Sequence, residues 1–125
     1  MAGLVTKRAA PEGGRKGESK FVEIWQLRKN NHAEHFVITA HGRKRLSERN
    51  IRLRDVMSVI EFGEIIEQYP DDTPFPSCLI LGTTPEGRHL HTVVSLDGEW
   101  IYLITAYEPD PNEWESDMMT RREER

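Results

Sequence analysis

The sequence predicts an α+β fold in which helices pack on one face of a small antiparallel sheet. Two amphipathic helical patterns come first, over about 41–49 and 53–62. Strand-like runs follow them, and the last two flank Asp97-Gly98, a strong signal for a two-residue hairpin loop. Helices grouped before such a meander imply that they cover one sheet face, which leaves the other face free to bind a ligand.

The segment before these two helices carries weaker signals. Ser19 is placed to cap a short helix in which Phe21, Ile24 and Trp25 share one apolar face. Residues 36–39 are mostly β-branched or aromatic and predict a short strand. This part of the chain is therefore expected to add one helix and one strand to the domain.

The later elements have clear boundaries in the sequence. Thr39 is placed to cap the helix over 41–49, and Asn50 is suited to end it in the left-handed conformation. The second helix presents an apolar stripe and ends at Gly63. Four strands are then expected, over residues 64–69, 77–81, 88–96 and 100–107.

The 125 residues fit one small domain. We expect a flexible arm over 1–18, a single α+β domain over 19–109 and an acidic tail over 110–125. The single cysteine, Cys78, excludes a disulfide framework and a multi-thiolate zinc site within one chain. No run approaches the roughly 18 apolar residues of a membrane span. The hydrophobic segment at the start of the chain is too short for a secretory signal. A soluble, cytoplasmic protein with no membrane partner is expected.

Positive charge is concentrated in one stretch, although the chain has a formal net charge of -4. Six basic residues fall within 43–54 and are opposed there only by Glu48. They are Arg43, Lys44, Arg45, Arg49, Arg52 and Arg54. Arginine suits phosphate because its guanidinium stays charged and binds oxygens in pairs. The stretch therefore favours a phosphate-bearing partner, and the alternative is a solvated helix face whose arginines pair with acidic residues elsewhere.

Within this stretch, His41, Arg45 and Arg49 are spaced four residues apart and would form one polar ridge on the helix. His41 would lie in the first turn, where the helix dipole disfavours the protonated imidazole. A neutral ring at that position could act as a base. The alternative is an exposed helix that carries an incidental histidine.

The strand over 88–96 alternates in a way that places His89 and His91 together on the open face. The pair could bind a metal, but no acidic partner has convincing spacing, so general acid–base chemistry is favoured. We therefore expect no metal and no other cofactor. Counting outward from the hairpin places His91 opposite residue 104, with Tyr107 near the His89 end. Tyr107 could stack on a base or donate a proton, or it could be a structural, half-buried tyrosine.

The stretch ITAHGRKRLSERNIRLRDV, followed by RHLHTVVS and by ITAYEPD ahead of Trp114, resembles a small bacterial and archaeal family of unknown function. Members of that family are often encoded beside a small zinc-finger protein of the MqsA antitoxin type. The family is similar to the RelE, BrnT and MqsR toxins, which are compact α+β ribonucleases that cut mRNA without a metal. The resemblance covers about residues 20–114 and implies a RelE-like fold.

The resemblance also implies a set of site residues. The family's helix histidine with two spaced arginines falls on His41, Arg45 and Arg49, its strand histidine on His91 and its terminal tyrosine on Tyr107. The implied catalytic residues are His41, Arg45, His91 and Tyr107. The residues expected to bind RNA are Arg43, Lys44, Arg49, Arg52, Arg54, Arg88 and His89.

The leading hypothesis is a toxin-like, metal-independent endoribonuclease that cleaves mRNA and is held inactive by a zinc-finger antitoxin in a type II pair. Such chemistry needs a base for the 2′-hydroxyl, cations for the phosphorane and an acid for the 5′-oxygen. One alternative is a non-catalytic protein- or RNA-binding module of the same fold, and another is a metal-dependent hydrolase. The enzyme requires His41, Arg45 and His91 to converge on one phosphate-sized site, whereas divergence favours the module.

Overall fold

The computed structural model describes residues 20–123, so the predicted arm over 1–18 lies outside the described residues. The elements in chain order are α1 (Ile24–Lys29), the 3-10 helix η1 (Ala33–His35), β1 (Phe36–Val37), α2 (Ala40–Glu48), α3 (Leu53–Phe62), β2 (Glu64–Tyr69), β3 (Ser77–Thr83), β4 (His89–Asp97) and β5 (Trp100–Tyr107). The predicted order of helices followed by a meander of strands is confirmed. None of the helices found between residues 20 and 123 has the length and hydropathy of a membrane span.

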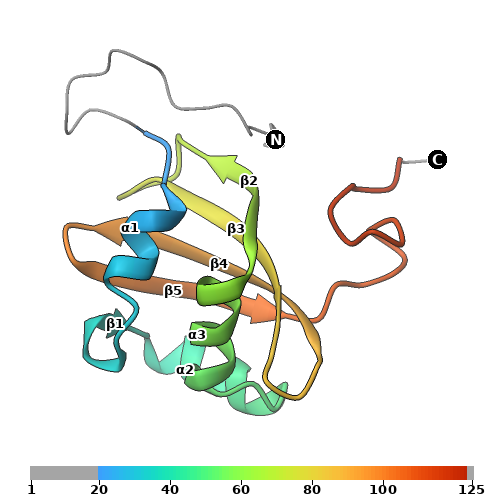
Figure 1. The fold of residues 1–125 in the computed structure, drawn as a ribbon, viewed down its shortest axis with the longest axis horizontal. Helices are drawn as coiled ribbons and strands as arrows, with labels where there is room; N and C mark the ends of the chain where they lie inside the picture. The colour runs from blue at the N-terminus through green and yellow to red at the C-terminus, as the bar shows by residue number, and fades with distance from the viewer. Residues whose placement is uncertain (1–19, 124–125) are drawn as a thin grey trace.

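Five strands form one open sheet in the order β1-β5-β4-β3-β2. The short edge strand β1 is parallel to β5, and the other neighbouring pairs are antiparallel. The three α-helices lie together on one face of the sheet (Figure 1). The predicted α+β class is therefore confirmed.

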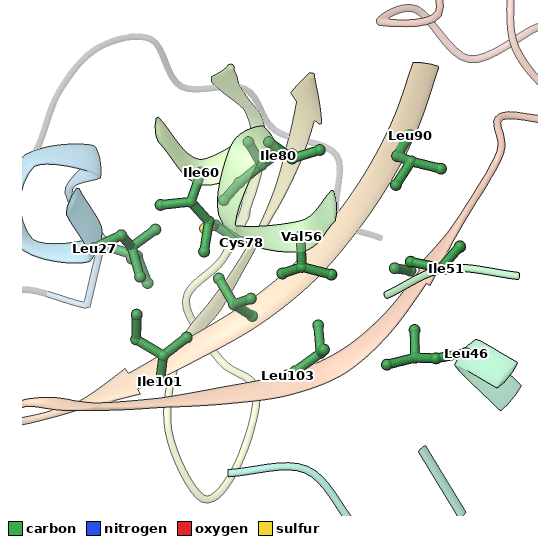
Figure 2. Packing of buried hydrophobic residues seen from close by; sticks show 14 residues of the cluster. Leu27, Leu46, Ile51, Val56, Ile60, Cys78, Ile80, Leu90, Ile101 and Leu103 are labelled. Carbon is green, nitrogen blue, oxygen red and sulfur yellow. The ribbon is translucent and has the colours of Figure 1, made fainter. Parts of the chain in front are cut away.

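The core lies between the helices and this sheet face (Figure 2). Val56 and Ile60 come from the apolar stripe of α3, and Leu46 is the buried residue of α2. The buried members of this cluster on the sheet are Cys78, Ile80, Leu90, Val94, Ile101, Leu103 and Ala106. These residues alternate along each strand, except between Leu103 and Ala106, where β5 carries an extra residue at a β-bulge, so the residues between them face the other side of the sheet.

Both predicted ends of α2 are confirmed. The Thr39 side chain accepts a hydrogen bond from the backbone N–H of Gly42 at 2.9 Å, as expected of a residue that caps a helix. Asn50 takes a φ of 59°, a left-handed conformation that asparagine tolerates better than most residues. The chain can then turn directly into α3. This short connection keeps the basic residues of both helices close together.

The tight turn between β4 and β5 lies one residue later than the dipeptide signal indicated. Asp97 still pairs with Trp100, so the two loop residues are Gly98 and Glu99. Gly98 has a φ of 63°, which a residue without a Cβ adopts without strain. Placing this glycine first in the loop moves the register of the whole hairpin.

The predicted register of His91 is wrong for this reason and for one more. The ladder also shifts by one residue at a β-bulge beside Val93 and Val94. As a result, His91 lies opposite Tyr107 and not opposite residue 104. Directly opposed residues share a sheet face, so this shift brings the two side chains together on the face away from the helices.

Residues 110–123 fold back on the molecule after β5 (red in Figure 1) and are called the C-terminal cover below. Trp114 pairs with Arg121 in an isolated antiparallel bridge, and only 2% of the Trp114 residue surface is exposed. The Asp117 carboxylate accepts hydrogen bonds from the N–H groups of Met119 and Thr120, at 2.8 and 2.9 Å, and so fixes the turn of this segment. The sequence predicted only an acidic tail here.

Candidate functional site

The basic residues of α2 and of the start of α3 form one exposed surface, called the α2–α3 basic surface below. Its members are His41, Arg43, Lys44, Arg45, Arg52 and Arg54, and each is exposed. The Thr39 cap, the left-handed Asn50 and the immediate start of α3 hold these side chains close together. An arrangement of fixed positive charges with solvent access is suited to a polyanion.

Protein carboxylates neutralise only part of this surface. The Nζ of Lys44 lies 3.9 Å from a carboxylate oxygen of Glu48, and the Nη2 of Arg54 lies 2.9 Å from one of Glu86. All four side chains are exposed. Within residues 20–123, the side chains of Arg43, Arg45 and Arg52 form no ion pair. Exposed ion pairs contribute little to stability, so the surface keeps most of its charge available for a ligand.

Two of the predicted RNA-binding arginines have structural contacts instead. Arg49 is half-buried and donates to the backbone carbonyl of Ala106 at 2.8 Å and to the Thr105 hydroxyl at 3.2 Å. Arg88 donates to the backbone carbonyls of Arg49 and Asn50 and pairs with Glu108 at 2.8 Å. These contacts tie the connection between α2 and α3 to the sheet. His89, by contrast, is exposed.

His91 is fully buried, so the expectation that it lies on an open sheet face is wrong. The C-terminal cover closes that face: the ring centroids of His91 and Trp114 are 4.4 Å apart, and the Nε2 of His91 is 2.7 Å from the backbone carbonyl of Met118. The Tyr107 ring lies 5.4 Å from His91 on the same face, as the observed register requires. The sequence alone does not predict this cover, because its contacts join segments that are far apart in the chain.

Beside His91, three further side chains form a hydrogen-bonded network. The Arg121 guanidinium donates to both carboxylate oxygens of Glu67, at 2.9 and 3.0 Å, and the Tyr69 hydroxyl donates to the same carboxylate at 2.5 Å. Arg121 also lies over the Trp114 ring, 4.5 Å from its centroid. With His91 and Tyr107, these residues are called the His91 cluster below.

The electrostatics of the His91 cluster favour the uncharged forms of its titratable rings. Burial lowers the pKa of His91, and the Arg121 charge lowers it further, while the Met118 carbonyl and the Glu67 charge act in the opposite direction. Burial also raises the pKa of Tyr107. Near neutral pH, His91 is therefore a neutral imidazole and Tyr107 a neutral phenol.

The predicted catalytic residues separate into two groups. His41 and Arg45 are exposed on α2, which packs on the helix side of the sheet, whereas His91 and Tyr107 lie on the opposite face beneath the C-terminal cover. The hydrogen bond and ring contacts of His91 within residues 20–123 involve neither His41 nor Arg45. Within residues 20–123, no direct contact therefore joins His41 or Arg45 to His91 in the way that the enzyme hypothesis required.

Sequence reasoning missed Glu67, Tyr69, Trp114 and Arg121. Glu67 and Tyr69 alternate along β2 and so share a face, but their neighbours follow only from the observed pairing of β2, β3 and β4. A single tryptophan in a largely polar, acidic segment was a usable signal for Trp114, because a large aromatic side chain gains by burial. Within the described chain, no group of three or more His, Cys, Asp or Glu residues is placed to hold a metal ion.

A family model described as a domain of unknown function, DUF4258, matches residues 38–108, more than half of the chain. The matched part includes α2, α3 and β2 to β5, and therefore both the α2–α3 basic surface and His91. It ends before the C-terminal cover, so Trp114, Met118 and Arg121 lie outside the matched range. No curated protein and no solved structure matches the chain significantly.

Proposed function

We propose that this chain, which belongs to the DUF4258 family, binds RNA through the α2–α3 basic surface. The observation that carries the proposal is a group of exposed arginines that have no carboxylate partner within residues 20–123, namely Arg43, Arg45 and Arg52. A protein of net charge -4 that keeps such a cluster unneutralised has a strongly polarised surface. RNA phosphates supply the matching charge, and each arginine that neutralises one releases a bound cation.

This function predicts affinity that falls with salt. We would measure the binding of a fluorescein-labelled single-stranded RNA by anisotropy over a series of salt concentrations. Replacing Arg45 by Gln should weaken binding and lower the slope of log affinity against log salt by about 0.7 for each lost phosphate contact on a single strand. Lys20→Gln is the matched control, because it removes one exposed charge that pairs with Asp71 away from this surface.

The proposal fails if the wild-type chain does not bind RNA, or if Arg45→Gln and Lys20→Gln reduce affinity equally. In the second case the effect would come from net charge alone and not from this surface. Circular dichroism of each variant ensures that a lost affinity is not a lost fold. Both substituted side chains are exposed, so we expect both variants to fold.

A second candidate function is RNA cleavage, as in a metal-independent endoribonuclease toxin of a type II pair that cuts mRNA and is restrained by a zinc-finger antitoxin. The observation that favours it is the His91 cluster, which gathers a carboxylate, a neutral imidazole and a guanidinium. In such a reaction a base would take the 2′-hydroxyl proton, and the 2′-oxygen would attack phosphorus. The bond to the 5′-oxygen would break as an acid protonates that oxygen, leaving a 2′,3′-cyclic phosphate.

Cleavage at this cluster requires the C-terminal cover to move, because His91 has no exposed surface. Growth after tightly induced expression separates the two functions. Growth arrest by the wild type that His91→Ala and Arg45→Ala relieve, with both variants soluble, would favour cleavage. Normal growth with a folded wild type, together with RNA binding in solution, would favour the binding module.

A further inference from the structure

A pocket of about 340 Å³ opens between α2 and the start of α3. Its lining residues are Ile38, Arg43, Leu46, Ser47, Asn50, Ile51, Arg52 and Leu53. Small-molecule sites occupy roughly 300–1,000 Å³, so this pocket is large enough for one small ligand and no more. It lies on the same part of the molecule as the α2–α3 basic surface but is a concave feature within it.

The lining combines two kinds of side chain. The apolar part comes from four aliphatic residues, Ile38, Leu46, Ile51 and Leu53. Among the residues that the structure describes, the side chains of the four polar lining residues, Arg43, Ser47, Asn50 and Arg52, have no hydrogen-bond or ion-pair partner. Such a lining offers hydrogen-bonding groups that are free of protein partners beside aliphatic side chains, as sites for small polar ligands do.

The charge of the pocket determines the class of ligand. Two of its lining residues are arginines, and none is acidic. The buried carboxylate of Asp55, in the first turn of α3, accepts a hydrogen bond from the backbone N–H of Arg52 at 2.8 Å and is not among the lining residues. Two guanidinium groups at one small pocket suit a phosphate, because each can donate two parallel hydrogen bonds to its oxygens.

We propose that this pocket binds one phosphorylated nucleotide, with Arg43 and Arg52 on the phosphate. The aliphatic side chains then contact the base, and the Ser47 hydroxyl and the Asn50 amide hydrogen-bond to its edge or to the sugar. The inference builds on the proposed RNA binding, since a nucleotide unit of an RNA strand is one source of this ligand. A free nucleotide has the same chemistry and is the other source.

The first experiment uses the full chain labelled with ¹⁵N and titrated with uridine 5′-monophosphate, uridine and inorganic phosphate. The monophosphate should shift the amide resonances of Ser47 and Asn50 and bind more tightly than either part alone. Arg43→Gln and Arg52→Gln should each weaken its binding about tenfold, the effect of losing one charge-assisted hydrogen-bonding group. Lys20→Gln is again the matched control: it removes one exposed positive charge, which pairs with Asp71, and Lys20 is neither a lining residue of the pocket nor a member of the α2–α3 basic surface.

A second variant tests the cavity without changing charge. Ser47→Leu fills part of the pocket with a side chain that favours helix, at an exposed position of α2 where the fold should tolerate it. Ser47→Leu should weaken binding of the monophosphate by a factor similar to that of the arginine variants. Full affinity in Ser47→Leu, or equal losses in Arg43→Gln, Arg52→Gln and Lys20→Gln, would overturn the pocket.

An oligouridylate, measured with the same variants, separates the two sources of ligand. If the pocket variants lose affinity for both the monophosphate and the oligouridylate, the pocket is assigned to a nucleotide of the RNA strand. Binding of the monophosphate without binding of the oligomer supports the pocket for a free nucleotide and overturns the proposed RNA binding. Binding of the oligomer that is insensitive to Arg43→Gln, Arg52→Gln and Ser47→Leu overturns the pocket and leaves RNA binding in place. If neither ligand binds, both proposals are wrong.

Discussion

His91 and Met118 are joined by a hydrogen bond of 2.7 Å between the imidazole Nε2 and the backbone carbonyl, across 27 residues of chain. A carbonyl oxygen only accepts, so Nε2 carries a proton. In the neutral ring the Nδ1 atom is then unprotonated, and it has no partner among the described residues. The C-terminal cover therefore fixes both the tautomer of His91 and its isolation from water, although it lies outside the part matched by the family.

The ion pair between Arg121 and Glu67 is expected to hold the C-terminal cover in place. Replacing Arg121 by Gln leaves the carboxylate of Glu67, whose side chain is only 7% exposed, without its cation. We expect the free energy of unfolding to fall by about 1–3 kcal/mol, as for a buried charged group that loses a hydrogen-bonding partner. The value stays below that of a fully buried pair because the Arg121 side chain is 51% exposed.

Urea unfolding followed by circular dichroism measures this difference. Arg122→Gln is the matched control: Arg122 lies next in the chain, donates to the Pro111 carbonyl at 2.7 Å and pairs with Glu115 at 3.1 Å, but the Glu115 side chain is 44% exposed, in contrast to the buried Glu67. An exposed pair contributes about 0–1 kcal/mol, so the control should remain close to the wild type. Equal losses in the two variants would show that the Glu67 contact has no special role in holding the cover.

The lowered pKa of His91 predicts a loss of stability in mild acid. In the unfolded chain the imidazole gains a proton as the pH falls below about 6.5, whereas the buried ring in the folded chain stays neutral. The unfolded state then binds more protons, so the free energy of unfolding decreases as the pH falls below this value. The contribution of one such group reaches at most about 1.4 kcal/mol per pH unit.

Comparison with His91→Gln isolates this contribution, because every other titratable group is common to both proteins. The difference in unfolding free energy between the two should change with pH below about 6.5 and stay constant above it. Proton NMR of the His91 ring gives a direct check, since its resonances should titrate below the range of an ordinary histidine. A ring that titrates at or above pH 6.5 in the folded protein contradicts the burial seen here.

Local signals in the sequence were sufficient for most of the fold. Thr39, Asn50 and Gly63 mark the ends of α2 and α3, and the capping and turn preferences behind them act within a few residues. The prediction of the register of β4 on β5 was wrong because the register depends on which residue starts the loop and on a β-bulge. Both are determined by packing of the assembled sheet. An error of this kind moves a side chain such as His91 relative to every cross-strand neighbour.

Of the two candidate sites, only the α2–α3 basic surface was predictable from the sequence. Arg43, Arg45 and Arg52 are close in sequence, so their clustering on one surface follows from two adjacent helices. The His91 cluster joins β2, β4, β5 and the C-terminal cover, and its contacts span up to 54 residues of chain. No spacing rule connects Glu67 to Arg121 over that separation, so the His91 cluster could be found only from the folded structure.

Cys78 is expected to be unreactive until the domain unfolds. The thiol has no exposed surface, and burial raises its pKa, which reduces the reactive thiolate. In native buffer a thiol reagent such as Ellman's reagent should release no prompt colour, and in urea it should titrate the single thiol of the chain. The rate in native buffer then reports opening of the core, and a prompt native reaction would contradict the packing of β3 beneath α3.

Gly82 is expected to be required for the close packing of α3 on β3. A Cβ at this position would lie 2.9 Å from the Cα of Val59, a backbone atom that can move only with its helix. Gly82→Ala should therefore lower the free energy of unfolding by about 1–3 kcal/mol, the usual cost of overpacking a well-filled core. Thr83→Ala provides the control, because this neighbouring side chain is exposed and its substitution should change stability by less than about 0.5 kcal/mol.

Urea unfolding of the two variants tests this packing, and its consequence reaches the α2–α3 basic surface. Because α3 begins at Leu53, beside the α2–α3 turn, a shift of the helix away from β3 also moves the residue that precedes it, Arg52. Gly82→Ala should then weaken RNA binding as well as lower stability, while Thr83→Ala should change neither. Unaltered stability in Gly82→Ala would mean that α3 can move away from the sheet at little cost, contrary to the contact with Val59.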